Sequence, residues 1–308
     1  MPTDFNYIRY LTAKKSVDDR ALNRHVLEAL AQAVRPRQKQ GPVTVLEVGC
    51  GIGTMVERLW DWEILTHADY TAIDVLPENI AEAQNRLPAY AQAQGLLVAA
   101  GGEGGFTAES SHRFLKVALE AIDFYDFASR EAGRFAGDLL VAHAFLDLVD
   151  LDRALPRLLA LLKPGGLFYF TLNFDGATIF LPPLDPDLDS RMEELYHGTM
   201  DDRRINERPS GSSRTGRLLF TALPRFGGRL VAAGSSDWVV FPGPEGYPGD
   251  EAYFLHYIVR TVENALRGHP LLPDEALTDW AARRQEQIEQ SKLVYIAHQL
   301  DFFGIKEG

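Results

Sequence analysis

The chain has 308 residues, of which 46% are hydrophobic and 24% charged, so it carries enough apolar material for a large folded core. Its formal net charge of −12 disfavours binding to nucleic acids or anionic membranes, since both depend on basic protein surfaces. No apolar run is long enough to span a bilayer, and the N-terminus lacks the apolar stretch of a signal peptide. We therefore expect a cytoplasmic protein.

The first 40 residues are predicted to form a helical segment ahead of the main domain. Residues 17–34 place apolar side chains at approximately helical spacing, with Asp18 or Asp19 near the start of the helix. The charged stretch 35–42 then ends in a turn. This segment precedes the first predicted strand and forms no part of the sheet.

Strands and helices alternate over most of the first 175 residues. Residues 100–114 are rich in glycine and are predicted to form a loop, and residues 151–162 form an amphipathic helix. Strands are expected at 44–48, 70–74, 116–122, 138–144 and 167–172. Alternation of this kind predicts βαβ units, and therefore a parallel sheet.

The second half of the sequence changes character. It begins with a Pro- and Asp-rich stretch and continues with helical segments that are interrupted at 208–216. A strand with a break is expected at 228–241, followed by helices near 250–267 and 274–290. The stretch 292–303 is predicted to be the last strand, returning to the sheet.

The strongest chemical signal is a glycine-rich turn after the first strand. Gly49, Gly51 and Gly53 alternate with other residues and follow Glu47. Glycine allows the positive φ of a tight turn and a close approach of the backbone to a ligand, and the next helix presents free N–H groups there. Asp74 ends the second strand, where a carboxylate can accept both hydroxyls of a ribose. The pattern predicts a nucleotide-like ligand.

This order of residues resembles the first motif of the class I S-adenosylmethionine-dependent methyltransferases. The turn Lys163-Pro164-Gly165-Gly166 before the fifth strand is also similar to that family, and the resemblance extends in detail over 44–173. It implies an α/β fold with a doubly wound, mostly parallel, seven-stranded sheet and helices on both faces. It also implies an antiparallel last strand and a cap inserted before the last two strands. We expect a cofactor-binding domain over 41–308, with 176–228 as a substrate cap and 1–40 as a lid segment.

The resemblance also implies which residues bind S-adenosylmethionine and its product S-adenosylhomocysteine. The resemblance implies that Asp123 faces the adenine amino group. Asp126 is an alternative residue for this position, and Asp123 could instead simply cap a helix. Cys50 is interpreted as a small turn residue rather than a nucleophile. The residues expected to bind the cofactor are Glu47, Gly49, Cys50, Gly51, Gly53, Asp74, Val75, Asp123, Phe124 and Ala142.

The residues expected on the acceptor side come from four separate segments. His143 follows the fourth strand and is interpreted either as a base that deprotonates the acceptor or as a neutral lining residue. Arg214 lies in a basic, hydroxyl-rich stretch that either clamps an anionic acceptor or is a solvated loop. Trp238 and Tyr10 either line the acceptor pocket or pack in the core.

These observations predict methyl transfer to a small-molecule acceptor, with an oxygen acceptor favoured because of His143. An NAD(P)-dependent oxidoreductase is the first alternative, although Thr54 replaces the third glycine of the dinucleotide fingerprint. Two more alternatives stay open: a protein that binds the cofactor without turnover, and a methyltransferase for protein or RNA. No metal site is expected, because the histidines are not paired at ligand spacing and there is a single cysteine. The sequence does not specify the acceptor or the oligomeric state.

Overall fold

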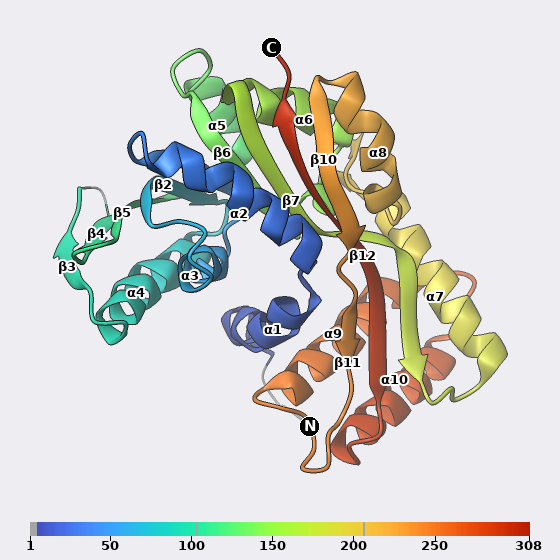
Figure 1. Ribbon diagram of the computed structural model, residues 1–308. Coiled ribbons are helices and arrows are strands. Elements are labelled where there is room, and N and C mark those ends of the chain that lie inside the picture. Colours follow the sequence, from blue (N-terminus) through green and yellow to red (C-terminus); the bar gives the residue numbers. More distant parts are fainter. Residues whose placement is uncertain (1–4, 103, 206) are drawn as a thin grey trace.

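A computed structural model describes residues 5–102, 104–205 and 207–308 (Figure 1). The helices are α1 (Tyr7–Ala21), α2 (Arg24–Gln38), α3 (Thr54–Asp61), α4 (Pro77–Ala93), α5 (Phe124–Arg130), the 3₁₀ turn η1 (Leu146–Leu148), α6 (Leu151–Ala160), α7 (Pro186–Asp201), α8 (Thr215–Arg225), α9 (Glu251–Leu266) and α10 (Asp274–Glu289). The strands are β1 (Val43–Val48), β2 (His67–Asp74), β3 (Leu97–Ala100), β4 (Phe106–Glu109), β5 (Phe114–Ala121), β6 (Gly137–His143), β7 (Leu162–Leu181), β8 (Arg204–Ile205), β9 (Arg208–Pro209), β10 (Gly228–Ser235), β11 (Trp238–Val240) and β12 (Val294–Lys306). Within the described residues, no helix is long and apolar enough to cross a bilayer.

The central sheet confirms the predicted α/β fold. Its strands follow the order β10-β12-β7-β6-β1-β2-β5-β4-β3, and β11 pairs with β12 at the side of this path. The five strands β7, β6, β1, β2 and β5 are parallel to one another, and β12 is antiparallel to β7, as predicted. The chain leaves β1 toward β2 on one side and later adds β6 on the other. The strand order therefore reverses next to β1, and in open α/β sheets ligands bind at such a point.

The sheet has ten strands across the described residues, so the predicted number of seven was too low. The additional strands are β11 and the hairpin of β3 and β4, which adds to the edge of the sheet through β5. Part of the hairpin lies in 100–114, where a loop was predicted. The glycines of this stretch make the turn, while Phe106 and Ala108 alternate with more exposed residues and are buried against the sheet.

The single helix predicted over 17–34 was also wrong, because α1 ends at Ala21 and α2 begins at Arg24. Asn23 caps α2 by accepting a hydrogen bond from the amide of Val26 at 3.1 Å. The amide of Asn23 in turn donates to Asp301 Oδ2 on β12 at 2.8 Å. This long-range contact holds the break between the two helices, so helical spacing alone could not locate it.

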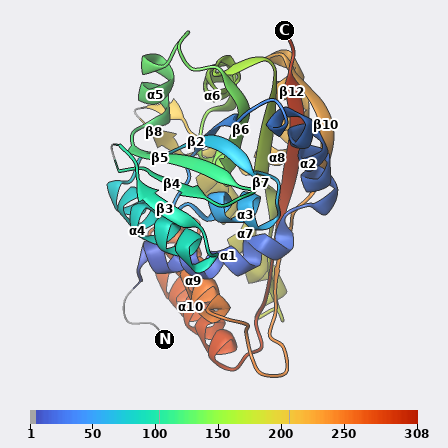
Figure 2. The same cartoon turned by 60° about the vertical axis from the view of Figure 1, so that its left-hand side comes forward.

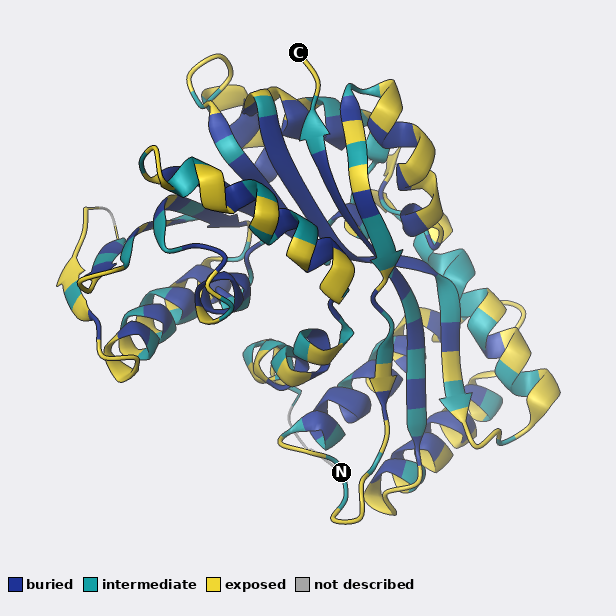
Figure 3. Ribbon diagram, in the orientation of Figure 1, coloured by how far each residue is buried: buried dark blue, intermediate teal, exposed yellow. Residues whose placement is uncertain are grey.

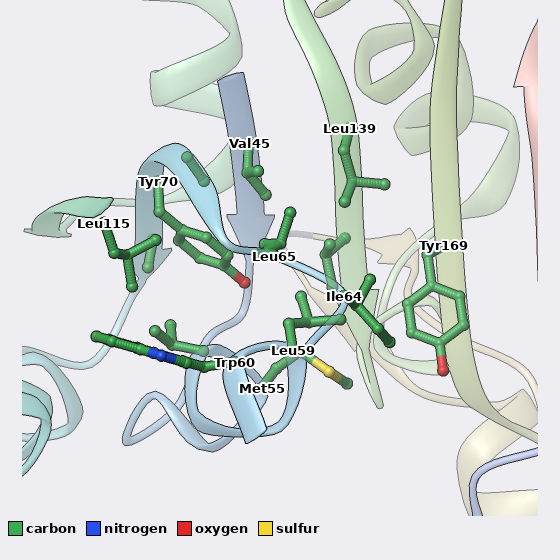
Figure 4. Packing of buried hydrophobic residues seen from close by; sticks show 14 of the residues in the cluster. Val45, Met55, Leu59, Trp60, Ile64, Leu65, Tyr70, Leu115, Leu139 and Tyr169 are labelled. Atoms are coloured by element: carbon green, nitrogen blue, oxygen red, sulfur yellow. The ribbon is translucent and has the colours of Figure 1, made fainter. Parts of the chain in front are cut away.

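Helices cover both faces of the parallel strands, as Figures 1 and 2 show. One apolar cluster contains buried side chains of α2, α3 and α4, and a second on the opposite face contains those of α5, α6 and α8. In Figure 4, Met55 and Trp60 of α3 pack beneath Val45 of β1 and Tyr70 of β2. Burying an apolar side chain of this size contributes roughly 1.5–3 kcal/mol, so these faces supply much of the stability.

A third apolar cluster lies beyond the sheet. Strands β7 and β12 continue past it as an antiparallel ribbon in which Val294 pairs with Leu181. Helices α1, α7, α9 and α10 pack around this ribbon, and we call these elements together the cap body. Figure 3 shows that the helices of the cap body turn their buried faces toward one another. Residues 176–228 contribute α7 to the cap body, whereas their α8 packs on the sheet.

Candidate functional site

A cavity of about 870 Å³ lies at the carboxyl ends of the parallel strands. One part of its lining follows β1 and β2 and includes the glycine turn and Asp74. A second part comes from the cap body and includes Tyr10, Tyr196 and Tyr257, and a third part comes from the segments 122–125 and 143–149 that follow β5 and end β6. A volume of this size accommodates a cofactor or drug-sized molecule, and the position matches the reversal of strand order.

The glycine turn needs glycine at each of its three positions. Gly49, Gly51 and Gly53 all have positive φ, at 69°, 55° and 82°. A Cβ on Gly49 would lie 2.8 Å from Phe145 Cδ2, and a Cβ on Gly53 would lie 2.7 Å from Leu87 Cδ1. A side chain at any of the three positions would therefore strain the backbone, and at Gly49 or Gly53 it would collide with Phe145 or Leu87. With glycine at these positions, the amides of the turn remain accessible from the cavity.

Asp74 joins the glycine turn to the start of α4. Its Oδ2 accepts a hydrogen bond from Gly51 N at 2.8 Å, and its Oδ1 accepts from Leu76 N at 2.9 Å and from Asn79 Nδ2 at 3.1 Å. Asn79 Oδ1 is buried at the cavity and has no hydrogen-bond partner among the described residues. This acceptor, beside a carboxylate with remaining lone pairs, fits the hydroxyl groups of a ribose.

Three of the residues expected to bind the cofactor, Glu47, Gly53 and Ala142, are not part of the cavity lining, and Glu47 and Ala142 lie behind it. Glu47 points into the core under the sheet, where Tyr70 donates a hydrogen bond to its Oε2 at 2.8 Å. Burial raises the pKa of Glu47 to about 8, so the side chain is protonated at neutral pH. Ala142 is also fully buried, in β6. Both sit outside the cavity lining and act at most by shaping the turn.

Val75, Asp123, Phe124 and Cys50 all line the cavity. Val75 is 61% exposed, while Phe124 is buried. Asp123 is exposed and caps α5, its Oδ1 accepting from Tyr125 N at 2.7 Å, so the capping interpretation holds and the second oxygen stays available. Burial raises the pKa of the Cys50 thiol well above its usual range, which agrees with a turn residue rather than a nucleophile.

His143 lies on the cavity wall with both ring nitrogens engaged. Its Nδ1 lies 2.8 Å from Thr171 Oγ1, and its Nε2 lies 3.0 Å from Asp18 Oδ2 and 3.2 Å from Arg58 Nη1. Burial lowers the pKa of His143 to about 4, so the ring is neutral at physiological pH. We assign the proton to Nε2, which then donates to Asp18. This arrangement favours a positioning role over the base role expected from the sequence.

The remaining acceptor-side residues are divided between the cavity and the surface. Tyr10 and Trp238 line the cavity, and Trp238 Nε1 donates to Asp18 Oδ1 at 2.9 Å. Arg214 is exposed at the start of α8 and lines a separate surface groove with His197 and Arg217. The structure therefore does not bring Arg214 together with the others. In the part of the chain that the structure describes, no three His, Cys, Asp or Glu side chains gather as a metal site requires.

Residues 46–170 match the family model described as "Methyltransferase domain". The matched stretch is therefore a methyltransferase domain. The match covers β1 to β7, the glycine turn and Asp74, and it confirms the family expected from the motif. No curated protein matches this chain.

Several solved structures have a similar overall arrangement. One is a SAM-dependent methyltransferase from Thiobacillus denitrificans in complex with S-adenosyl-L-homocysteine, with 14% identity, 97% of this chain and 99% of that chain covered, and a TM-score of 0.44. Another is geranyl diphosphate C-methyltransferase from Streptomyces coelicolor, with 10% identity, 92% and 81% covered, and a TM-score of 0.41. A third is phosphoethanolamine N-methyltransferase 2 from Haemonchus contortus, with 11% identity, 99% and 59% covered, and a TM-score of 0.43. At these values, the likeness identifies no substrate.

Sequence reasoning missed several polar residues of the cavity. Asp147 lines it from the short connection between the predicted strand 138–144 and the helix 151–162, Arg203 from a stretch predicted to contain helical segments, and Gln299 from β12. Lys14 and Asp18 of α1 also line it and form a buried ion pair with Nζ–Oδ2 at 2.6 Å. Their spacing of four residues on a helix was a detectable signal for that pair. The other three carry no local signal, because their burial is created by distant elements.

Proposed function

We propose that this protein transfers the methyl group of S-adenosylmethionine to a small-molecule acceptor held in the cavity. The observation that carries the proposal is that one cavity is lined both by the glycine turn with Asp74 and by the aromatic side chains of the cap body. A donor site and an acceptor site that share one enclosed space allow a direct displacement at the methyl group. Enclosure by the cap body favours a small acceptor over a flat macromolecular surface.

The cofactor would be held by the residues around the turn. Asp74 and Asn79 offer acceptors for the ribose hydroxyls, and the free oxygen of Asp123 offers one for the adenine amino group. The amides of the turn face the same space at the start of α3. S-adenosylmethionine supplies a methyl group on a sulfonium, so the protein's own task is to position the acceptor and to exclude water.

Helix α1 would act as the lid of this cavity. Tyr7, Tyr10, Leu11 and Lys14 on α1 line the cavity, and α1 packs against α9 and β11. Asp18 of α1 is hydrogen-bonded to His143, so closure of the lid and orientation of the imidazole depend on one another. The preference for an oxygen acceptor rested on His143 as a base, and its engaged nitrogens remove that support.

Binding of the cofactor is tested first, with a matched pair of variants on one strand. Asp74→Asn should weaken the binding of S-adenosylhomocysteine, measured by calorimetry, by about tenfold or more, because a hydrogen bond to a charged group contributes roughly 1.5–3 kcal/mol. Asp69→Asn makes the same change of charge at an exposed position of β2 and should leave binding unchanged. Equal affinities of the two variants would contradict the assignment of Asp74.

Transfer is tested with methyl-labelled S-adenosylmethionine and a fractionated cell extract. Label in small molecules would support the proposal and identify the acceptor by mass spectrometry. Label in protein or RNA would keep the reaction but refute the acceptor class. Cofactor binding without transfer to any fraction would favour a binding protein without turnover, and binding of a nicotinamide dinucleotide instead would favour the oxidoreductase.

A further inference from the structure

Asp147 presents an unpartnered carboxylate oxygen to the cavity. It lies in η1, directly after β6, and its Oδ1 is buried without a hydrogen-bond partner within residues 5–102, 104–205 and 207–308. The backbone around it is held firmly, because Arg203 Nη2 donates to Asp147 O at 2.7 Å and Ser210 Oγ donates to Leu148 O at 2.7 Å. The position of the carboxylate is therefore set by other contacts, while its Oδ1 has no hydrogen-bond partner within the described residues.

Gln299 is a second polar side chain of this kind, contributed by a different element. It lies on β12, is only 2% exposed, and lines the same cavity. Its Oε1 is buried and also has no hydrogen-bond partner in the described part of the chain. Leaving such groups unpaired is costly, by about 1–3 kcal/mol for a neutral group and more for a charge. Two buried oxygen atoms without hydrogen-bond partners in the lining of one cavity point to a ligand that brings hydrogen-bond donors.

The charged groups around Asp147 are already committed to other partners. Lys14 of α1 pairs with Asp18, and Arg203 Nε donates to Ser210 O at 2.7 Å. Tyr196 of α7 faces the same space. On the two elements packed against η1, Arg217 of α8 pairs with Asp175 of β7. Burial raises the pKa of Asp147 to about 6, with Lys14 and Arg203 acting in the opposite direction.

We infer that Asp147 is the general base of the transfer, and that the acceptor carries its reactive atom as an N–H or O–H group. This inference rests on the proposed function. The lone pair of the acceptor nitrogen or oxygen forms the new bond to the methyl carbon, and the carbon–sulfur bond breaks with its electron pair remaining on sulfur. The proton of the acceptor atom passes to Asp147 Oδ1 and then to water. Gln299 Oε1 accepts a hydrogen bond from a second N–H or O–H group of the substrate.

An acceptor without an N–H or O–H group at its reacting atom would leave Asp147 Oδ1 without a hydrogen-bond partner. A carbon or thioether acceptor brings no N–H or O–H at its reacting atom, so Asp147 would stay buried and unpaired while the substrate is bound. A carboxylate with a raised pKa suits proton transfer better than an ordinary one, because it holds the proton more strongly while being ionised at neutral pH. The geometry and the chemistry therefore favour the same class of acceptor.

The turnover test compares Asp147→Asn with Asp202→Asn, which makes the same change at an exposed position after α7. Both are incubated with methyl-labelled S-adenosylmethionine and the small-molecule fraction of a cell extract. Asp147→Asn should transfer roughly 100-fold more slowly or worse, Asp147→Glu should recover part of the rate, and Asp202→Asn should match wild type. The wild-type rate should fall as the pH drops below about 6. Label on carbon or sulfur, or an unimpaired Asp147→Asn, would overturn the inference.

A binding test decides the same question without turnover. With saturating S-adenosylhomocysteine, calorimetry compares primary amines and alcohols with methyl ethers and hydrocarbons of equal size. The N–H and O–H probes should bind more tightly, and Asp147→Asn should lose about tenfold affinity for them alone. Equal binding of ethers, or equal binding by the variant, would overturn the inference. Loss of S-adenosylhomocysteine binding by the wild-type protein would instead contradict the proposed function, so the two failures are distinct.

Discussion

The buried carboxylate of Asp18 should be one of the most important side chains for the stability of the fold. Its exposed fraction is 2%, and it accepts hydrogen bonds from Lys14 Nζ at 2.6 Å, Trp238 Nε1 at 2.9 Å, His143 Nε2 at 3.0 Å and Arg58 Nη2 at 3.3 Å. These contacts join α1 to α3, β6 and β11. Lys14, His143 and Arg58 hold the pKa of Asp18 well below its usual range, against the effect of burial.

Asp18→Asn keeps the size of the side chain and removes its charge. Arg58 keeps Asp19, whose Oδ1 lies 2.5 Å from Arg58 Nε, whereas Lys14 forms no second ion pair within the described residues and feels the charge of Asp147 only from a longer distance. Removing one partner of a buried ion pair costs about 3–5 kcal/mol. Because burial already lowers the pKa of Lys14, this amine can lose its proton, which places the expected loss near the lower limit, at about 3 kcal/mol. That is a large part of the free energy of unfolding of a typical domain, which is ~5–15 kcal/mol.

The assay is urea unfolding at pH 7, followed by far-ultraviolet circular dichroism. The matched control is Asp250→Asn, which also removes a carboxylate charge that pairs with a basic residue of α1. Asp250 is 43% exposed, and its Oδ2 lies 2.7 Å from Arg9 Nε, so the control should lose at most about 1 kcal/mol. Equal losses in the two variants, or a loss below about 1 kcal/mol for Asp18→Asn, would refute the reasoning.

Three further predictions concern the turn, the core and the surface. Gly53→Ala should destabilise the protein by about 1–3 kcal/mol and weaken binding of S-adenosylhomocysteine, because φ is 82° and the Cβ would lie 2.7 Å from Leu87 Cδ1. Urea unfolding measures the loss of stability, and calorimetry measures the loss of affinity. Glu47 has a pKa of about 8 in the folded protein against an ordinary 4.5, so the folded state binds the extra proton and stability should fall as the pH rises between these values, by on the order of 4 kcal/mol. Glu47→Gln should flatten this dependence in unfolding curves from pH 5 to 9, and an unchanged slope would contradict the raised pKa. Arg214→Ala should leave the KM for the acceptor unchanged, because Arg214 lies outside the cavity, and a clear rise in KM would restore the clamp expected from the sequence.

Much of the donor side of the site was predictable, because its geometry is local. Glycines at alternate positions after a strand impose a tight turn with positive φ, and Asp74 follows on the adjacent parallel strand. Parallel neighbours end at the same edge of a sheet, so the turn and the carboxylate had to meet. The family resemblance, rather than this geometry, suggested Val75 and Phe124, and both line the cavity.

The acceptor side was decided by tertiary structure. His143 was predicted just after the fourth strand and is the last residue of β6, but its pKa and engaged nitrogens depend on Asp18, which lies 125 residues away in the sequence. Asp147 was overlooked because an aspartate in a short connection normally faces water. Its burial depends on the cap body, whose elements come from both ends of the chain.

The sequence by itself determined the order of strands and helices in the parallel part of the sheet, the glycine turn and the place where a nucleotide can bind. These features follow from backbone conformation and from alternation of apolar residues over short stretches. Only the tertiary structure decided which polar side chains are buried, which of them are paired, and which face the cavity unpaired. Burial and pairing depend on contacts between distant segments, and they set the pKa of each group, so the chemistry of the acceptor wall emerges only when the chain is folded.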